Sequence, residues 1–314
     1  MPCTKVAKAL ATARPYLKFS GTTDEAVTVS GGQVVTFLAD SGAELTRGTG
    51  TGAIVTVRDD GTALQVYDLQ ISDAPNNASG IGIAIPTASG SPTVRLTRTT
   101  LNNNPGGGVS ASGGTVQIVQ STISGNAGGG VSCSGGALTI AQSTVATNDG
   151  GGVSVAGAGA TFDIRNNFIY RNGDQDTGTF GGLNLGIALA TGNHLEFNTI
   201  VDNRAAVNSG GVVCNVPTFA APNNIIVRNS LGGSETAANA QTDGACTYPT
   251  SSIASDATGL AFAHPDGSPF DYHLTSGSSA IDTGTTATDT TIDVDGDARP
   301  QGPADDRGAD EFKP

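Results

Sequence analysis

Gly106-Gly107-Gly108-Val109-Ser110 is repeated twice at intervals of 22 residues, as Gly128-Gly129-Gly130-Val131-Ser132 and as Gly150-Gly151-Gly152-Val153-Ser154. Between the copies, residues 115–126 resemble residues 137–148 position by position. A fixed period in the twenties is typical of a solenoid, in which each repeat forms one coil that cannot bury its apolar side alone. The sequence therefore predicts one elongated domain of stacked coils.

The composition favours β-strands over helices. The chain of 314 residues holds 45 glycines and no tryptophan, and charged residues make up only 14% of it. A helical protein would not carry so many glycines, because each one inside a helix costs about 1 kcal/mol relative to alanine. Disorder is excluded as well, since apolar and β-branched residues recur at fixed positions of the repeat.

The charge is unevenly distributed and excludes some partners. The net charge is −13, and residues 256–314 hold twelve acidic side chains against three basic ones. An acidic chain without a basic stripe would be repelled by nucleic acid. No apolar run approaches the roughly 18 residues of a membrane span. We therefore expect no nucleic-acid partner and no membrane span, and we expect the chain to be a monomer.

Two apolar rows define the expected interior of the solenoid. The first row consists of Ile71, Leu101, Ile123, Val145, Ile169, Ile200 and Ile226. The second lies five residues earlier in each coil and consists of Val66, Leu96, Ile118, Ile140, Ile164, Leu195 and Ala221. Three residues after the first row, from Leu101 on, come Asn104, Asn126, Asn148, Asn172, Asn203 and Asn229. Because asparagine tolerates left-handed turns and can bond to the same group on the next coil, we interpret these residues as a structural ladder.

The ends of the chain are expected to close the stack. Residues 1–20 are predicted to hold a capping helix, which Thr4 begins and Pro15 helps to end. Residues 21–230 are predicted to form the β-helix. The period is lost after Asn229. Residues 231–314 are therefore predicted to be an irregular segment of the same domain that packs along or over the last coils and closes that end.

The start of the chain and its four cysteines bear on the compartment. Met1 leads into the helix-like segment without the apolar stretch of a signal peptide, so we expect that a secretory leader is not included here.

Cys214 and Cys246 flank one irregular segment and are expected to form a disulfide in an oxidising compartment. Cys133 stands three coils from Cys214, on the order of 14 Å at ~4.8 Å per strand, which is too far for a bridge. Cys133 is therefore expected to be a free, buried thiol.

The end of the chain carries the most distinctive motifs. They are Tyr272-His-Leu274, Ser279-Ala-Ile-Asp-Thr-Gly284, Asp293-Val-Asp-Gly-Asp-Ala-Arg-Pro300 and Asp306-Arg-Gly-Ala-Asp-Glu311. Together with the glycine repeats they resemble bacterial proteins of the pectate-lyase-like superfamily that are labelled choice-of-anchor Q domain proteins. The resemblance implies an all-β, single-stranded right-handed parallel β-helix, export, and association with the cell surface. It implies no reaction.

Four charged or titratable side chains form an expected outward cluster. Asp163 and Arg165 flank one inward residue, and His194 and Glu196 flank another, so all four should point outward. Stacking places Asp163 beside His194 and Arg165 beside Glu196. We interpret the cluster as cross-strand charge pairing, worth about 0.2–1 kcal/mol per pair. The alternative is a carbohydrate-binding or catalytic groove in which His194 and Glu196 transfer protons.

Two further groups of polar residues are candidate sites. Arg171, Asp202 and Arg228 fall in one row on consecutive coils, with Asp174 and Asp176 in an adjacent insertion, and these five are candidate binding residues. The second group, a candidate Ca²⁺ site, is Asp293, Asp295 and Asp297, with Asp289 upstream.

The acidic turn does not have the spacing of a known calcium loop. An EF-hand places its glycine after the third acid and a glutamate at the twelfth position, and this sequence does neither. The favoured interpretation is a turn in which Arg299 pairs locally. Apart from this possible Ca²⁺, no cofactor is expected.

The favoured function is a secreted or surface-displayed structural or binding protein, adhesin-like or carbohydrate-binding and without catalysis. Its expected partner is an extracellular polysaccharide or another cell-surface component. The alternative is a polysaccharide lyase or glycoside hydrolase that acts on an acidic polysaccharide. Polygalacturonase-like sites resemble Asn-Thr-Asp, Asp-Asp, Gly-His-Gly and Arg-Ile-Lys in order, and this chain does not hold that set. These absences favour the binding protein.

Overall fold

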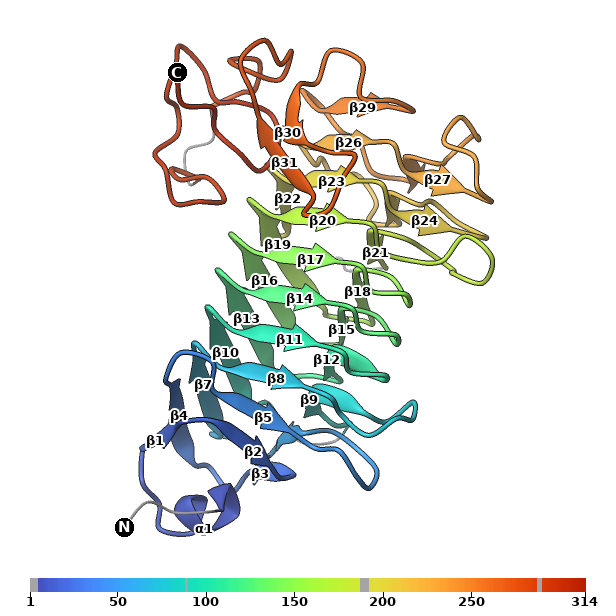
Figure 1. Cartoon of the computed structure of the whole chain (residues 1–314). Helices are drawn as coiled ribbons and strands as arrows, with labels where there is room; N and C mark the ends of the chain where they lie inside the picture. The colour runs from blue at the N-terminus through green and yellow to red at the C-terminus, as the bar shows by residue number, and fades with distance from the viewer. Residues whose placement is uncertain (1–4, 88–89, 187–191, 287–289) are drawn as a thin grey trace.

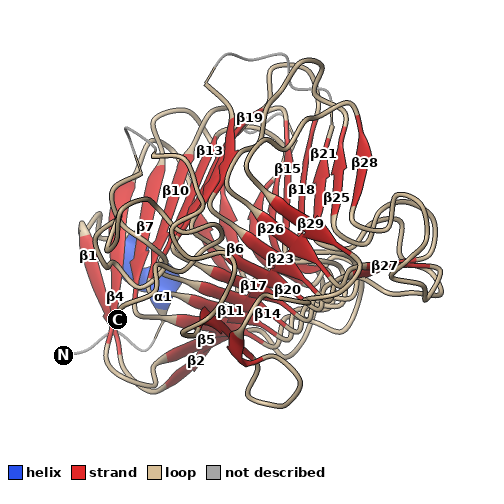
Figure 2. Cartoon of the chain, turned by 90° about the horizontal axis from the view of Figure 1, so that it is seen from above, coloured by secondary structure: helices blue, strands red, loops and turns tan. Residues whose placement is uncertain are grey.

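The computed structural model describes residues 5–87, 90–186, 192–286 and 290–314. Three parallel sheets enclose one long apolar core, and the chain rises by one coil each time it has contributed a strand to every sheet (Figures 1 and 2). Strand partners are separated by whole coils of sequence, as in the pairing of Ile123 with Leu101 and Val145. The structure is therefore the parallel β-solenoid that the repeat predicts.

The strands of each sheet follow one another in chain order. Sheet A contains β1 (Tyr16–Phe19), β4 (Val34–Ala39), β7 (Ala63–Tyr67), β10 (Thr93–Thr97), β13 (Thr115–Val119), β16 (Ala137–Ala141), β19 (Thr161–Arg165) and β22 (His194–Glu196). Sheet B contains β2 (Thr22–Asp24), β5 (Glu44–Thr46), β8 (Gln70–Ser72), β11 (Thr100–Asn102), β14 (Thr122–Ser124), β17 (Thr144–Ala146), β20 (Phe168–Tyr170), β23 (Thr199–Val201), β26 (Ile225–Val227) and β29 (Ser252–Ala254). Sheet C contains β3 (Val27–Val29), β6 (Val55–Val57), β9 (Ile81–Ile85), β12 (Gly107–Ala111), β15 (Val131–Ser134), β18 (Val153–Ala156), β21 (Leu183–Leu185), β25 (Val212–Cys214) and β28 (Thr242–Gly244). Two small pairs complete the strands: β24 (Arg204–Ala205) with β27 (Ser230–Leu231), and the antiparallel hairpin of β30 (Phe262–His264) and β31 (Asp271–Leu274).

Both apolar rows lie inside the solenoid, as predicted. The first row is stacked in register through sheet B and is fully buried from Ile71 to Ile226. The second row is stacked in register through sheet A from Val66 to Leu195, and Ala221 is buried beyond the last strand of that sheet. The alternation of inward and outward side chains along each strand is thus read correctly from the sequence.

The asparagine row forms a buried hydrogen-bonded ladder. Asn126 Nδ2 donates to Leu101 O at 3.1 Å and to Asn148 Oδ1 at 2.8 Å, and Asn148 Oδ1 also accepts the Asn126 N–H. Gln241 takes the place of an asparagine above Asn229. One expectation is corrected: the left-handed position is held by the residue before the ladder, such as Asn103 with φ 54°.

A second ladder, which the sequence did not reveal, runs along the turn between sheets A and B. It joins Thr99, Ser121, Ser143, Asn167, Asn198, Asn224 and Ser251 through side-chain bonds to the backbone N–H of the coil before. The row contains threonine, serine and asparagine, so no single residue type marks it. Both ladders pair backbone groups that would otherwise be buried without partners.

The solenoid is longer than predicted at both ends. β1 already pairs with β4 in sheet A, and β28 and β29 add strands to sheets C and B, so the coils span residues 16–254 rather than 21–230. The last coil escaped prediction because it is held mainly by backbone pairing and carries few apolar anchors. The first coil is covered by α1 (Val6–Leu10), which is shorter than expected.

The capping helix is held by a residue from the solenoid. The Glu25 carboxylate accepts the N–H groups of Val6 at 2.7 Å and Ala7 at 3.1 Å, which are free at the start of any helix. The cap expected from Thr4 lies outside the described residues.

The described parts of the C-terminal segment, residues 255–286 and 290–314, lie along the outside of the last coils (Figure 1). Phe262, Tyr272 and Leu274 of the hairpin pack on the outward side chains of sheet B, among them Val201 and Val227. The segment was expected to pack along or over the coils, and it packs along them. The end of the main core is instead lined by Phe219, Cys246 and Tyr248.

Candidate functional site

The predicted charged cluster is present on the outward face of sheet A. Asp163 pairs with His194 and Arg165 with Glu196 in the register of β19 and β22. Arg165 Nε lies 2.6 Å from Asp163 Oδ1 and 3.4 Å from Glu196 Oε1, and His194 Nδ1 lies 3.1 Å from the same glutamate oxygen. The four side chains therefore form one network of ion pairs and hydrogen bonds.

The C-terminal segment covers part of this network. Arg165 Nη1 donates to Thr290 Oγ1 at 3.1 Å, and the adjacent Asn166 donates to Ile292 O at 2.8 Å. The side chains of Arg165 and Glu196 are only 13% and 11% exposed, whereas His194 keeps 35%. Arg165 thus holds the segment while Glu196 is buried beside it, and the arrangement favours charge pairing over an open catalytic groove.

The row of Arg171, Asp202 and Arg228 also holds the C-terminal segment. Asp202 accepts hydrogen bonds from Tyr272 Oη at 2.6 Å and from Arg228 Nε at 2.9 Å. Arg171 lies over the ring of Phe270, with its Cζ 4.2 Å from the ring centroid. Burial, and then the hydrogen bond to Asp202, raises the pKa of Tyr272 above its usual range. The structure thus brings Arg171, Asp202 and Arg228 together beneath the hairpin of β30 and β31.

Asp174 and Asp176 lie apart from that row. Asp174 Oδ1 accepts the N–H groups of Asp176 at 2.7 Å and Thr177 at 2.9 Å, and these bonds lower the pKa of Asp174. Asp176 is exposed. Across the described parts of the chain, no ion pair joins either carboxylate to Arg171 or Arg228.

The three acids of the candidate Ca²⁺ site have separate partners. Asp293 is fully buried and accepts the N–H groups of Asp295, Asp297 and Glu311. The Asp297 carboxylate pairs with Lys313, and that of Asp295 pairs with His273. Asp293 thus closes a turn, in line with the favoured interpretation. Asp289 lies outside the described residues.

Arg299 does pair within the C-terminal segment, but with a partner that was not expected. Its buried guanidinium lies 2.8 Å from Glu311 Oε2 and stacks over the ring of Phe197, 4.6 Å from the centroid. Burial lowers the pKa of Arg299.

The cysteines are arranged as expected. Cys214 and Cys246 form a disulfide with a Cα–Cα distance of 5.6 Å, and Cys133 is free and buried in the core. Burial raises the pKa of the Cys133 thiol, which makes it a poor nucleophile.

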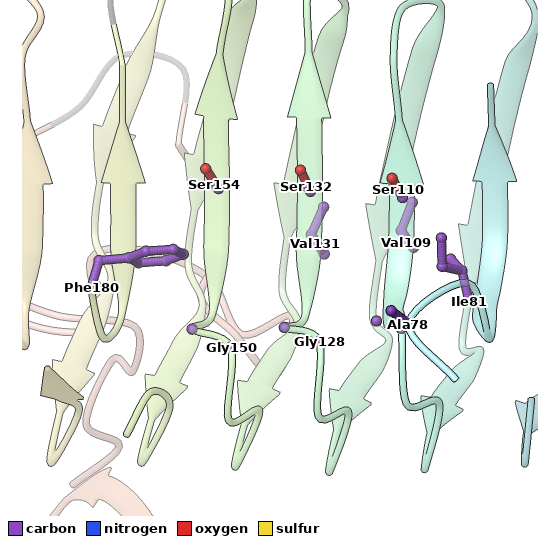
Figure 3. A pocket seen from close by; sticks show the side chains of 14 residues that line it. Ala78, Ile81, Val109, Ser110, Gly128, Val131, Ser132, Gly150, Ser154 and Phe180 are labelled. Carbon is purple, nitrogen blue, oxygen red and sulfur yellow. The ribbon is translucent and has the colours of Figure 1, made fainter. Parts of the chain in front are cut away.

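Sequence reasoning missed a groove on the outward face of sheet C. It has a volume of about 400 Å³ and runs across β12, β15 and β18, over the repeated glycine triplets (Figure 3). Its floor lacks side chains because each triplet packs tightly on its neighbours: a Cβ on Gly128 would lie 2.4 Å from the carbonyl carbon of Gly106. The glycines that specify the stack therefore also leave its backbone open to solvent.

The groove has a polar side and an apolar side chain at each end. Ser110, Ser132 and Ser154 form one row along it, spaced by the strand separation of ~4.8 Å. Phe180 lies at one end, where it replaces the first glycine of the next triplet, and its ring lies over Gly151. Ile81 lies at the other end (Figure 3). The interruption of the triplet at Phe180 was the sequence signal for this site.

Comparisons with known proteins support the architecture. The family model described as the right handed beta helix region matches residues 53–249. No curated protein matches the chain. Among the residues described, the helical part is too short to cross a membrane.

Proposed function

This chain belongs to the right-handed β-helix family, and from that premise we propose that it binds a neutral linear polysaccharide, without catalysis, in the groove on sheet C. The groove is the observation that supports the proposal. In this role the protein is an adhesin-like component that is secreted or displayed at the cell surface.

The chemistry of the groove suits an uncharged sugar chain. The serine hydroxyls both donate and accept hydrogen bonds, and the glycine floor lets a ligand approach the backbone closely. The ring of Phe180 supplies an apolar wall, so the groove combines a few polar groups with apolar surface, as small-molecule sites commonly do. Because the serine row repeats with the coils, it can meet successive units of a polymer.

The charge of the protein favours a neutral polymer over an acidic one as the ligand of the groove. None of the residues that line the groove is charged, and the whole chain carries −13. An acidic polysaccharide would meet repulsion and no compensating base. The Cys214–Cys246 disulfide is consistent with export, since such bonds persist in oxidising compartments.

Binding can be tested with an array of neutral and acidic glycans, followed by calorimetry on the neutral polymers. Ser132→Phe places a bulky ring in the middle of the groove and should weaken binding at least about tenfold. Thr139→Phe adds the same ring to the same coil on sheet A and should leave binding unchanged. Equal effects of the two substitutions, or binding of uronate polymers alone, would contradict the proposal.

The lyase or hydrolase alternative rests on the contact between the partly exposed His194 and the buried Glu196. It requires cleavage of uronate polymers, which can be followed by new reducing ends and by the absorbance of unsaturated products. We expect no cleavage. Activity that disappears in the His194→Gln/Glu196→Gln protein would replace binding with catalysis as the function.

A further inference from the structure

Three segments of the C-terminal region bring potential metal ligands together. His273 comes from β31, Asp295 from the turn closed by Asp293, and Asp310 from the last residues of the chain. One ligand atom from each of the three side chains lies within 4.8 Å of the other two. The sequence analysis assigned only one of these three, Asp295, to a metal site, with different partners.

A carboxylate orients the imidazole toward the cluster. His273 Nδ1 lies 2.5 Å from Asp271 Oδ1, so this nitrogen carries the proton and donates it to the carboxylate. His273 Nε2 faces the cluster, 2.9 Å from Asp295 Oδ2, and once it is deprotonated its lone pair is available to a metal ion there. The ring of Phe168 packs edge-on against the imidazole, with centroids 4.8 Å apart. A histidine that ligates a metal is characteristically held through its other nitrogen by a carboxylate in this way.

Asp310 supplies a buried carboxylate whose charge is poorly compensated. It is 7% exposed, and Oδ2 accepts the Leu274 N–H at 2.6 Å. Within the described segments, that is its one hydrogen bond, so Oδ1 has none. A second carboxylate, that of Asp295, faces the same space, and a divalent cation would relieve both charges.

We propose that His273, Asp295 and Asp310 bind one divalent transition-metal ion, best matched by Zn²⁺, which fastens the end of the chain to β31. One imidazole nitrogen with two carboxylate oxygens is a ligand set for Zn²⁺, whereas Ca²⁺ takes six to eight oxygens. Zn–ligand bonds of about 2.0–2.2 Å require the side chains to close slightly around the ion. Asp295 is exposed and provides the entry path, and water completes the coordination. The site is independent of the glycan groove.

The test uses the full chain after treatment with a chelator. Titration with Zn²⁺ should show one ion per chain by calorimetry and by elemental analysis, and the bound ion should raise the melting temperature. Asp295→Asn should weaken binding at least about tenfold, and Asp271→Asn, which releases the imidazole, about 10–100-fold. Asp297→Asn is the matched control: it removes one charge from the same turn, where Asp297 pairs with Lys313, and should leave the affinity unchanged.

Replacing Zn²⁺ with Co²⁺ gives a spectroscopic signal that reports metal ligation and does not depend on the stability of the protein. A bound Co²⁺ should show visible absorption bands that disappear in His273→Gln. Because Asp295 is exposed, Asp295→Asn should fold even if His273→Gln does not. The proposal is overturned if no stoichiometric ion binds, if Asp297→Asn weakens binding as much as Asp295→Asn, or if Ca²⁺ binds and Zn²⁺ does not.

Discussion

At the scale of single residues, each glycine of the repeated triplet meets a different steric demand. A Cβ on Gly128 would collide with Gly106, and Gly129 has φ 107°, a conformation that side chains rarely allow. A Cβ on Gly130 would lie 2.5 Å from Gly152 O on the next coil. The ladder asparagine beside them is equally constrained, since Asn148 is fully buried and joins three coils.

Replacing one asparagine of the ladder tests how much the ladder contributes to stability. Asn148→Ala leaves the Asn126 N–H and the Ile123 carbonyl without their partners, and we expect a loss of about 3 kcal/mol in the free energy of unfolding. Asn103→Gly is the control, because Asn103 is exposed and left-handed and glycine accepts that conformation. Urea denaturation measures both. A loss below about 1 kcal/mol for Asn148→Ala would show that the ladder is dispensable.

At the scale of elements, the antiparallel hairpin of β30 and β31 provides the binding partners of the charged side chains on the outer face of sheet B. It lies on sheet B, where Tyr272 reaches Asp202 and Phe270 lies under Arg171. Arg228 joins Asp202 to Asp266 of the hairpin loop, at 2.9 Å in each case. Residues that the sequence offered as a binding row thus anchor a segment of the chain itself.

The Tyr272 contact predicts a pH-dependent stability. The folded-state pKa of Tyr272 is raised, so its proton is retained longer in the folded than in the unfolded chain, and stability falls as the pH rises above about 10. Tyr272→Phe removes this dependence and also the hydrogen bond to a carboxylate, so it should cost about 1–3 kcal/mol at pH 8. The difference between the two proteins should therefore shrink at pH 10.5 in urea titrations. A constant difference would contradict the assignment.

At the scale of the whole molecule, the solenoid is a stack of similar coils whose outer faces end up in different environments. Sheet C keeps an open face with the groove, whereas the last strands of sheet B carry apolar outward side chains, among them Val201, Ile225 and Val227. The described residues of the C-terminal segment cover those side chains and form a second, smaller core with them.

A truncated chain that ends at residue 254 tests whether the C-terminal segment is needed to cover the apolar outer face of sheet B. It retains all three sheets but exposes the apolar outward face of β20, β23 and β26. We expect far-UV circular dichroism to remain that of a β-protein, while dye binding and self-association increase, since large exposed apolar patches promote association. A truncated protein that stays monomeric with an unchanged melting temperature would show that the segment is not needed to cover this face.

The sequence by itself determined the solenoid, its two interior rows, one asparagine ladder and the pairing of Asp163 with His194. These features follow from the alternation of side chains along a strand and from the repetition of coils, which places equivalent residues side by side. It did not reveal the last coil, where few apolar residues mark the period.

Only the tertiary structure decided which outward residues remain accessible. Arg165 meets Thr290 across 125 residues, and Asp202 meets Tyr272 across 70. The C-terminal segment has no period, so its docking depends on the shape and chemistry of the finished outer surface. The groove and the cluster of His273, Asp295 and Asp310 arise in the same way, from surfaces and chain ends that become neighbours only after the coils have stacked.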